Sequence, residues 1–200
     1  MNEPFSAWIQ GVWYYGPVLG AGILLVILGL GMLLFFRDFP REITAAPNEV
    51  VSPADGTVVA IEDLEETPHY EGKTRRISIF MSVFNAHVNR APYEGTVREL
   101  KYAPGQYKNA MRPDSTRLNE SNAVWMDTPR GPMTVRQISG AIARRIVCPV
   151  QAGTKLDKGE KFGMIRFGSR VELYLPPDTE VCVTLKEKVY AGSSVVARFP

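Results

Sequence analysis

Cysteine and histidine are scarce in this chain, with two of each among its 200 residues. Cys148 and Cys182 stand far apart and match neither a metal-binding nor a redox spacing. We therefore expect no metal centre and no disulfide framework, which is compatible with a reducing compartment. The formal net charge is only +2, so the composition gives no sign of a nucleic-acid partner.

Charge is missing altogether from the N-terminal segment. No charged residue occurs from Pro4 to Phe36, and the densest apolar run is Gly16 to Phe36. This run is long enough to cross a hydrocarbon core of about 30 Å at about 1.5 Å per helical residue. Four aromatic residues precede it, as in an interfacial belt: Trp8, Trp13, Tyr14 and Tyr15. Residues 1–36 are predicted to form a membrane anchor, with one crossing and a re-entrant hairpin both open.

Lysine and arginine are also absent before the apolar run, whereas Arg37 and Arg41 follow it directly. A cleaved signal peptide would have a basic start, so a retained anchor is favoured. By the positive-inside tendency, we expect the anchor in the cell (inner) membrane and the rest of the chain in the cytoplasm.

The remaining sequence favours β-structure. Residues 37–51 are rich in proline and small residues and are predicted to be an extended linker. Apolar alternation predicts strands at residues 75–84, 171–175 and 181–185, the first of them central because both its faces are apolar. A short helix is expected at Lys108–Arg112, before Pro113.

Weak internal echoes point to the same architecture. DGTV at Asp55–Val58 recurs as EGTV at Glu94–Val97, and each precedes an expected strand. The pattern is similar to the barrel-sandwich hybrid of biotinyl and lipoyl carrier domains. The predicted fold is mostly β: residues 52–200 form a compact β-sandwich or barrel-sandwich hybrid-like domain, preceded by an N-terminal transmembrane helix.

Three short stretches contain groups suited to chemistry: SPADG, FNAHVNRAP and FGS, which contribute Asp55, His87 and Ser169. Serine is a poor nucleophile until a base takes its proton, and a carboxylate orients an imidazole that acts as this base. Each stretch alone has a commoner structural interpretation, since Asp-Gly is a frequent turn pair and a lone histidine after a strand is more often structural. We assign no role to His69, the other histidine.

Taken together, MSVFNAHVNRAP, SPADG and RFGSRVELYLP resemble the phosphatidylserine decarboxylase family in its short, membrane-anchored form. FFRDFPRE after the apolar run and GAIARRIV at Gly140–Val147 are similar to that family as well. The resemblance extends from about Phe35 to Val196, and several motifs in the right order make it specific.

The resemblance implies that the protein cuts its own Gly168–Ser169 bond. Ser169 Oγ would attack the Gly168 carbonyl, and an N-to-O acyl shift would give an ester. Loss of the Ser169 α-proton would then leave dehydroalanine, which hydrolyses to a pyruvoyl group and ammonia. The products, residues 1–168 and 169–200, would stay together as a heterodimer. A cut at the other Gly-Ser pair, Gly192–Ser193, would release only residues 193–200.

The resemblance also implies the reaction and its participants. The pyruvoyl group would be the cofactor, forming a Schiff base with phosphatidylserine, and loss of carbon dioxide would give phosphatidylethanolamine. His87 is the candidate for both processing base and proton donor, with Asp55 orienting it. The expected partners are a phospholipid substrate and the membrane.

One departure from the family bears on the role of His87. The long bacterial form has two histidines three residues apart, and the second position here is Arg90. Either His87 serves in both steps or another group takes one of them. The long form also has leucine where this chain has Phe167, so the short form is the better match.

Three other functions remain open from the sequence. A close variant would decarboxylate a serine ether lipid of archaeal type. A membrane-tethered, non-enzymatic β-sandwich adaptor would keep an intact chain. A serine hydrolase would use Asp55, His87 and Ser169, although the chain has no G-x-S-x-G elbow.

Overall fold

The computed structural model describes residues 5–112, 114–141, 145–166 and 168–200, with side chains described from Tyr15 onward. Phe167 and Arg144, which belong to the motifs quoted above, lie outside these ranges. The chain divides into two units, Met1–Arg37 and Asp38–Pro200, which are described separately.

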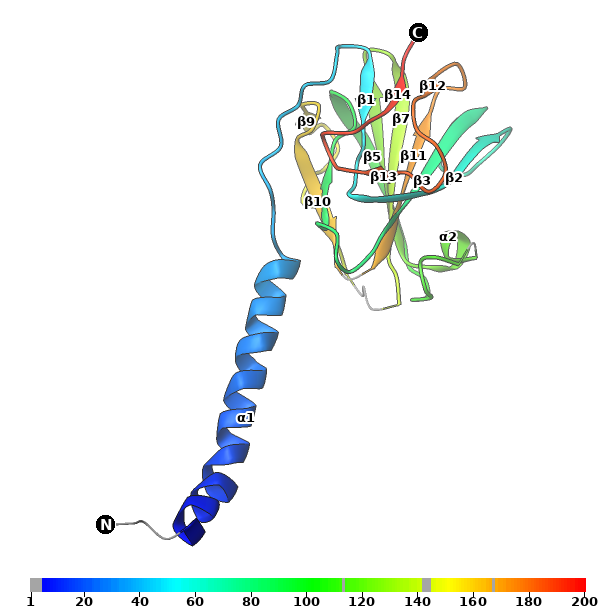
Figure 1. The fold of residues 1–200 in the computed structure, drawn as a ribbon. Helices are drawn as coiled ribbons and strands as arrows, with labels where there is room; N and C mark the ends of the chain where they lie inside the picture. Colours follow the sequence, from blue (N-terminus) through cyan, green and yellow to red (C-terminus); the bar gives the residue numbers. More distant parts are fainter. Residues whose placement is uncertain (1–4, 113, 142–144, 167) are drawn as a thin grey trace. The chain divides into compact units, whose positions relative to one another are not determined.

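The first unit consists of one helix, α1 (Phe5–Phe35), drawn in blue in Figure 1. Within it, Tyr15–Phe35 has a mean hydropathy of 2.7 and is the one stretch of the described residues that is long and apolar enough to cross a membrane. The Arg37 guanidinium donates a hydrogen bond to the Leu34 carbonyl (2.6 Å) and so satisfies one of the free carbonyls at the helix end. The segment is therefore a single helix, not a re-entrant hairpin.

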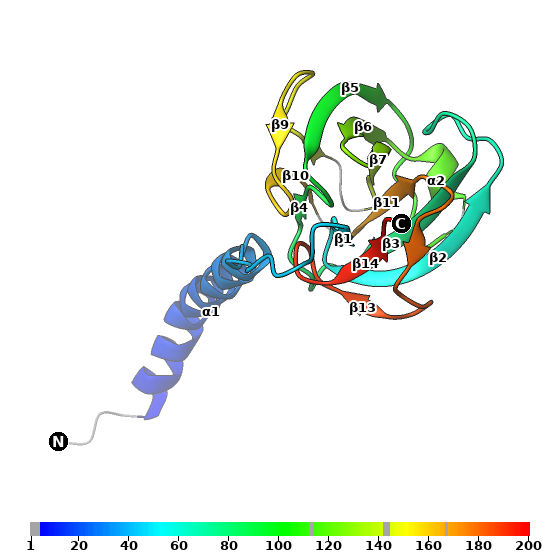
Figure 2. The same cartoon turned by 90° about the horizontal axis from the view of Figure 1, so that it is seen from above.

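The second unit is built from antiparallel sheets, which confirms the predicted mostly-β fold class. The largest sheet has the order β13-β2-β3-β11-β7-β6-β5-β9 and curls strongly when seen from above (Figure 2). Its strands are β13 (Lys188–Val189), β2 (Gly56–Leu64), β3 (Thr74–Met81), β11 (Ser169–Leu175), β7 (Gly131–Ile138), β6 (Ser121–Thr128), β5 (Gly95–Ala103) and β9 (Lys155–Leu156).

Two three-stranded sheets and one short helix complete this unit. One sheet has the order β1-β14-β12, formed by β1 (Glu49–Val51), β14 (Val195–Arg198) and β12 (Glu180–Val181). The other has the order β4-β10-β8, formed by β4 (Val88–Arg90), β10 (Lys161–Ile165) and β8 (Ile146–Val147). The helix is α2 (Ser115–Leu118).

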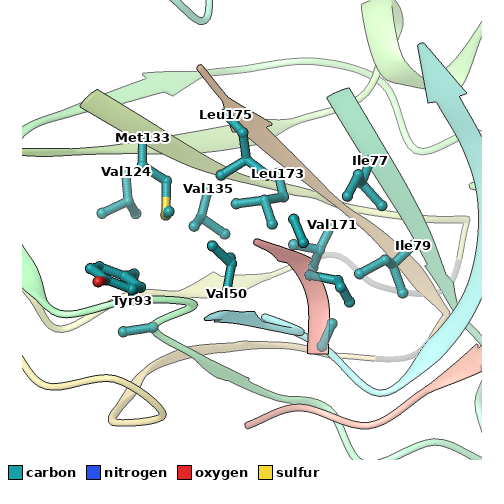
Figure 3. Packing of buried hydrophobic residues seen from close by; sticks show 14 of the residues in the cluster. Val50, Ile77, Ile79, Tyr93, Val124, Met133, Val135, Val171, Leu173 and Leu175 are labelled. Carbon is teal, nitrogen blue, oxygen red and sulfur yellow. The ribbon is translucent and has the colours of Figure 1, made fainter. Parts of the chain in front are cut away.

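Strand β11 is the centre of the large sheet, and all seven of its residues are buried. Val171, Leu173 and Leu175 point into the apolar core that Figure 3 shows. On the opposite face Glu172 accepts hydrogen bonds from Arg136 (3.3 Å) and from the Tyr174 hydroxyl (2.6 Å). Because both faces are covered, the polar face of this strand is as closed to water as its apolar face.

Two of the three predicted strands are confirmed. The strand predicted at residues 75–84 is β3, and it is central because β2 and β11 pair with its two edges. The strand predicted at 171–175 is β11, which starts two residues earlier.

The strand predicted at residues 181–185 is wrong. β12 ends at Val181, and the chain turns between Thr184 and Glu187. The Glu187 carboxylate accepts hydrogen bonds from the Thr184 amide (2.9 Å) and hydroxyl (3.1 Å), and Lys186 adopts a φ of 70°. These local bonds stabilise a turn that apolar alternation does not reveal.

The helix predicted at Lys108–Arg112 is also wrong. The helical turn occurs after this segment, as α2. The Asn119 side chain accepts from the Lys108 amide (2.9 Å) and donates to the Lys108 carbonyl (2.8 Å). Asn119 therefore occupies the Lys108 carbonyl, which a helix at this position would need for the Arg112 amide. That amide bonds to the Asn109 carbonyl instead.

The segment between the anchor helix and β1 is extended and bound along the second unit. Arg41 pairs with Asp55 (2.9 Å), and Arg90 pairs with Asp38 (3.2 Å). Lys158 Nζ donates to the Ala46 carbonyl (2.8 Å), and the Tyr93 hydroxyl donates to the Pro47 carbonyl. Residues 38–48 thus pack as part of the second unit.

We predict that His69 makes the second unit sensitive to acid. The His69 ring lies 5.8 Å from the Tyr174 ring, and burial, followed by the nearby charges of Arg136 and Arg76, lowers the pKa of His69 from 6.5 to about 4. Since the folded-state pKa lies below the ordinary value, protons bind the unfolded chain more readily. The stability is fully present above pH 6.5 and is lost as the pH falls toward about 4.

The measurement is the melting temperature of the full chain in detergent at about pH 7.5 and about pH 5. The parent should lose about 2–4 °C more than His69→Gln on acidification. Equal losses in the two proteins would assign the acid sensitivity to other groups.

Candidate active site

Ser169 lies at the first position of β11, where the chain enters the centre of the sheet. It pairs with Met81, the last residue of β3, and its side chain is fully buried. Its hydroxyl donates to the Met81 sulfur at 3.4 Å, a weak acceptor. The hydroxyl is therefore excluded from water and loosely held.

Gly168 makes the turn into β11 with a φ of +63°, a conformation that favours glycine over residues with a side chain. Its amide donates to Nε2 of His87 at 3.4 Å. This contact places the imidazole beside the residue whose carbonyl the predicted self-cleavage attacks. It also requires an unprotonated Nε2 that faces the Gly168–Ser169 backbone.

His87 is fully buried in the connection between β3 and β4. The turn before it is closed by Asn85, whose side chain accepts from both the amide and the hydroxyl of Ser82 (2.8 Å each). After it, the His87 carbonyl accepts from the Ile165 amide at the end of β10 (3.3 Å). Short polar bonds on one side and a backbone hydrogen bond on the other therefore fix the backbone that carries the imidazole.

Gly140 is a site residue that the sequence did not indicate on chemical grounds. A Cβ at this position would lie 1.9 Å from the Gly168 carbonyl oxygen, so the backbone of Gly140 packs directly against that carbonyl. The preceding residue, Ser139, is held in place, because its amide donates to the Glu120 backbone carbonyl (2.9 Å) and its carbonyl accepts from the Asn119 side-chain amide (2.8 Å). The GAIARRIV resemblance contained the only signal for this position.

Asp55 is almost completely buried, with 5% of its surface exposed. Its carboxylate accepts from Arg41 (2.9 Å) and from the backbone amide of Ala191 (2.7 Å). These bonds join the SPADG turn to the segment after α1 and to the segment after β13. The orientation of His87 by Asp55 stays a prediction, since the contacts described for this carboxylate lead to Arg41 and Ala191.

Arg90 occupies the position of the second histidine of the long form. Its guanidinium donates to the carbonyls of Gly159 (3.0 Å) and Phe39 (3.2 Å) and to the Asp38 carboxylate (3.2 Å). Arg90 therefore ties β4 to the segment that follows the anchor helix.

A cavity of about 280 Å³ adjoins Gly168. Its walls come from the end of β3, from the loop before α2 and from the segment after β7. The lining residues are Phe80, Ser82, Val83, Asn109, Ala110, Met111, Ala141 and Gly168. Arg170 holds one wall, because it donates to the carbonyls of Ala110 (3.0 Å) and Met111 (3.4 Å).

The structure thus brings together Ser169, Gly168 and His87 and adds Gly140 and a cavity. Within the described ranges, no group of three or more His, Cys, Asp or Glu side chains is arranged to hold a metal ion. A buried hydroxyl, a glycine carbonyl and an unprotonated imidazole nitrogen are the groups that an intramolecular acyl shift needs.

The chain is similar to known proteins over most of its length. The sequence model of the family described as phosphatidylserine decarboxylase matches residues 28–197. A phosphatidylserine decarboxylase proenzyme of Magnetococcus marinus is 45% identical over 186 residues, which cover 92% of this chain and 84% of that protein. The proenzyme of Nitrosomonas europaea is 45% identical over 174 residues, 86% and 80% of the two chains. That of Burkholderia cenocepacia is 46% identical over 164 residues, 82% and 76% of the two chains.

We predict that Gly140→Ala slows self-cleavage by on the order of 100-fold, the cost of a displacement of about 1 Å in a reacting group. The new methyl group would lie 1.9 Å from the Gly168 oxygen, so one of the two backbones has to move. The rate is measured by denaturing electrophoresis after synthesis of the chain.

Gly95→Ala is the matched control, because it also brings a methyl group too close to a backbone carbonyl. Gly95 lies in β5, its Cβ would meet the Asp127 carbonyl oxygen at 2.7 Å, and neither residue lines the cavity. It should perturb packing and leave the cleavage rate close to that of the parent. Cleavage of Gly140→Ala at the parent's rate would show that contact at this carbonyl is unimportant.

Proposed function

This chain belongs to the phosphatidylserine decarboxylase family, and we propose that it makes its catalytic group from Ser169 by cutting the bond to Gly168. It is a carboxy-lyase that converts phosphatidylserine to phosphatidylethanolamine. The single observation that supports the assignment of Ser169 is its burial beside Gly168, whose amide contacts His87.

The first covalent step uses only groups of this chain. His87 Nε2 takes the hydroxyl proton of Ser169, and Oγ bonds to the Gly168 carbonyl carbon. The bond from this carbon to the Ser169 nitrogen then breaks, and the proton passes to that nitrogen, which leaves an ester and a free amine. The contact between Gly140 and the Gly168 oxygen restricts where the carbonyl can move while the bonds exchange.

The second stage removes the ester. Loss of the Ser169 α-proton expels the Gly168 carboxylate and leaves dehydroalanine. Water then replaces its nitrogen, which departs as ammonia, and the keto group of a pyruvoyl remains. When formed, this group provides the electron sink for decarboxylation of the serine headgroup.

The residues around position 169 fit such a group. The position is closed to bulk water, lies at the start of a rigid central strand and adjoins a cavity of about 280 Å³ through Gly168. A fixed position and exclusion of water are what a reactive carbonyl requires. His87, the imidazole next to this position, is our candidate proton donor to the carbon that loses carbon dioxide.

The two fragments are expected to remain one heterodimer. Residues 169–200 contribute β11, which pairs with both β3 and β7, as well as β13 and β14, which pair with β2 and β1. The same residues supply Val171, Leu173 and Leu175 to the core that the larger fragment shares. Separation would expose this core and break four strand pairings, β11 with β3 and β7, β13 with β2, and β14 with β1.

We place the enzyme in the cell (inner) membrane with its catalytic unit in the cytoplasm. Tyr15–Phe35 supplies the span, and Arg37 and Arg41 follow it, which agrees with the positive-inside tendency. A membrane anchor raises the concentration of the enzyme at the surface that contains its lipid substrate.

The other candidate functions are not favoured. The relatives compared above are named as decarboxylase proenzymes, whereas an adaptor would have no need of a buried serine beside an imidazole. A serine hydrolase is not favoured either, because Ser169 does not lie in a G-x-S-x-G elbow and the relatives are named as decarboxylase proenzymes. Phosphatidylserine is favoured over an ether lipid because the family and its relatives carry that name.

We predict that Ser169→Ala leaves one uncut chain without decarboxylase activity. The parent should give a fragment of residues 169–200 with a blocked N-terminus that reacts with hydroxylamine, as seen by intact mass. Both fragments should elute together in detergent without denaturant and separate in guanidinium chloride.

Ser193→Ala is the matched control, because Gly192–Ser193 is the other glycine-serine pair. This variant should be cut like the parent. Processing of Ser169→Ala at the same bond would rule out our assignment of the catalytic group.

We predict that His87→Ala slows self-cleavage by about 10²–10⁴-fold, the usual contribution of a general acid or base. Decarboxylation by the fraction that does mature should fall as well. Quantitative mass spectrometry gives the cut fraction, and release of labelled carbon dioxide per pyruvoyl group gives the second rate. His69→Gln is the control, and normal rates for His87→Ala in both steps would remove this residue from the mechanism.

A further inference from the structure

Three large apolar side chains are open to solvent in the wall of the Gly168 cavity or next to it, in a second pocket that shares Phe80 and Ser82 with the cavity. Val83 is 37% exposed, Phe84 is 82% exposed and Met111 is 61% exposed. Val83 and Met111 line the cavity, and Phe84 directly follows Val83. We call these three residues the rim.

Both segments of the rim are held in shape by local polar bonds. The Ser82 hydroxyl accepts from the Phe84 amide (3.4 Å) and donates to the Asn85 side chain (2.8 Å). In the other segment, the Asn109 side chain accepts from the Met111 amide (3.0 Å), and Arg170 donates to the Met111 carbonyl (3.4 Å). The backbone therefore presents these apolar side chains outward from two fixed turns.

Cationic side chains accompany the rim. Arg112 follows Met111 with 68% of its side chain exposed, and Lys108 lies on the same loop with 38% exposed. Both side chains pair with the single carboxylate of Asp114, so the three residues together carry a net positive charge. Apolar side chains bordered by basic ones are typical of surfaces that enter the headgroup layer of an anionic membrane.

The position of the rim beside the cavity indicates which kind of partner, a protein or a bilayer, binds to it. A protein bound over Val83 and Met111 would cover the cavity, and with it the way to Gly168. A bilayer in the same place would offer the cavity its substrate, since the substrate is itself a membrane lipid. An apolar rim around the entrance to a lipid's reaction site is therefore explained by contact with lipid.

We propose that the rim inserts into the interface of a phospholipid bilayer and seats the mouth of the cavity on it. Phosphatidylserine then passes from the bilayer into the cavity without crossing water. This inference rests on the proposed function, because it takes the Gly168 cavity as the reaction site.

The first test measures insertion directly. The full chain with Phe84→Trp is reconstituted in phosphatidylcholine vesicles with added phosphatidylglycerol. Its added tryptophan should fluoresce at shorter wavelength than a tryptophan exposed to water, and brominated lipids should quench this fluorescence. Pro177→Trp is the control, because Pro177 is exposed and follows Leu175, at the end of β11 opposite Ser169. Its emission should not be quenched, and the parent gives the background from the native tryptophans.

The second test measures the use of insertion in catalysis. Phe84→Ser should lower kcat/KM for long-chain phosphatidylserine in vesicles by about tenfold or more, as expected for loss of an interfacial aromatic anchor. On dihexanoyl phosphatidylserine, supplied as monomers, its kcat/KM should stay within about twofold of the parent. Leu185→Ser is the control, because Leu185 is 58% exposed and lies between β12 and β13, in a segment that contributes no residue to the rim or to the cavity.

The outcomes separate this inference from the proposed function. Unquenched Phe84→Trp, or equal losses of Phe84→Ser on both substrates, would overturn insertion of the rim. The same holds if Phe84→Ser keeps full activity on vesicles, the result expected if a protein covers the rim instead. Failure of the proposed function has a different signature, namely a parent chain that stays uncut and acts on neither substrate.

Discussion

The burial of β11 on both faces is the constraint on which the rest of the structure depends. Apolar side chains fill one side, and Glu172 with its arginine and tyrosine partners closes the other. Ser169 is the first residue of this strand, so its position is fixed by pairing with β3 on one edge, while the next residue pairs with β7. If the chain is cut just before such a strand, strand pairing keeps the new N-terminus in place. The proposed cleavage site therefore lies at the start of the strand whose pairing would hold the two fragments together.

The short motifs of the sequence supply four candidate site residues, of which three lie together, while the described contacts of the fourth, Asp55, lead to Arg41 and Ala191. Ser169, Gly168 and His87 each belong to a stretch whose order along the chain resembles the family, and the structure brings all three together. The sequence did not reveal Gly140, whose importance lies in a close approach to the Gly168 oxygen, or the cavity wall held by Arg170. Both depend on contacts between segments far apart in sequence, and neither requires a residue type with obvious chemistry.

The fold was predictable where burial dominates and unpredictable where local polar bonds do. Alternation identified β3 and β11 because both lie in the middle of the sheet, where side-chain pattern and pairing agree. It failed at residues 181–185, where Glu187 closes a turn, and at residues 108–112, where Asn119 takes the backbone bonds of Lys108. In both places the hydrogen bonds of one polar side chain determine the backbone conformation. A hydrophobic pattern averaged over several residues does not detect such a side chain.

The two Gly-Ser pairs differ in their surroundings, and the difference bears on the proposed cleavage at Gly168–Ser169. Gly168 and Gly192 both have a positive φ, +63° and +75°, so backbone conformation alone does not distinguish them. Their serines differ, since Ser169 is fully buried whereas Ser193 is exposed. Only at the first pair do the described contacts include an imidazole nitrogen on the glycine amide. An exposed ester would meet water and hydrolyse back to an ordinary serine. A buried one lasts until its α-proton is removed. In the proposed reaction, the dipeptide supplies the bond that is cut, and its buried surroundings favour elimination to a ketone over hydrolysis.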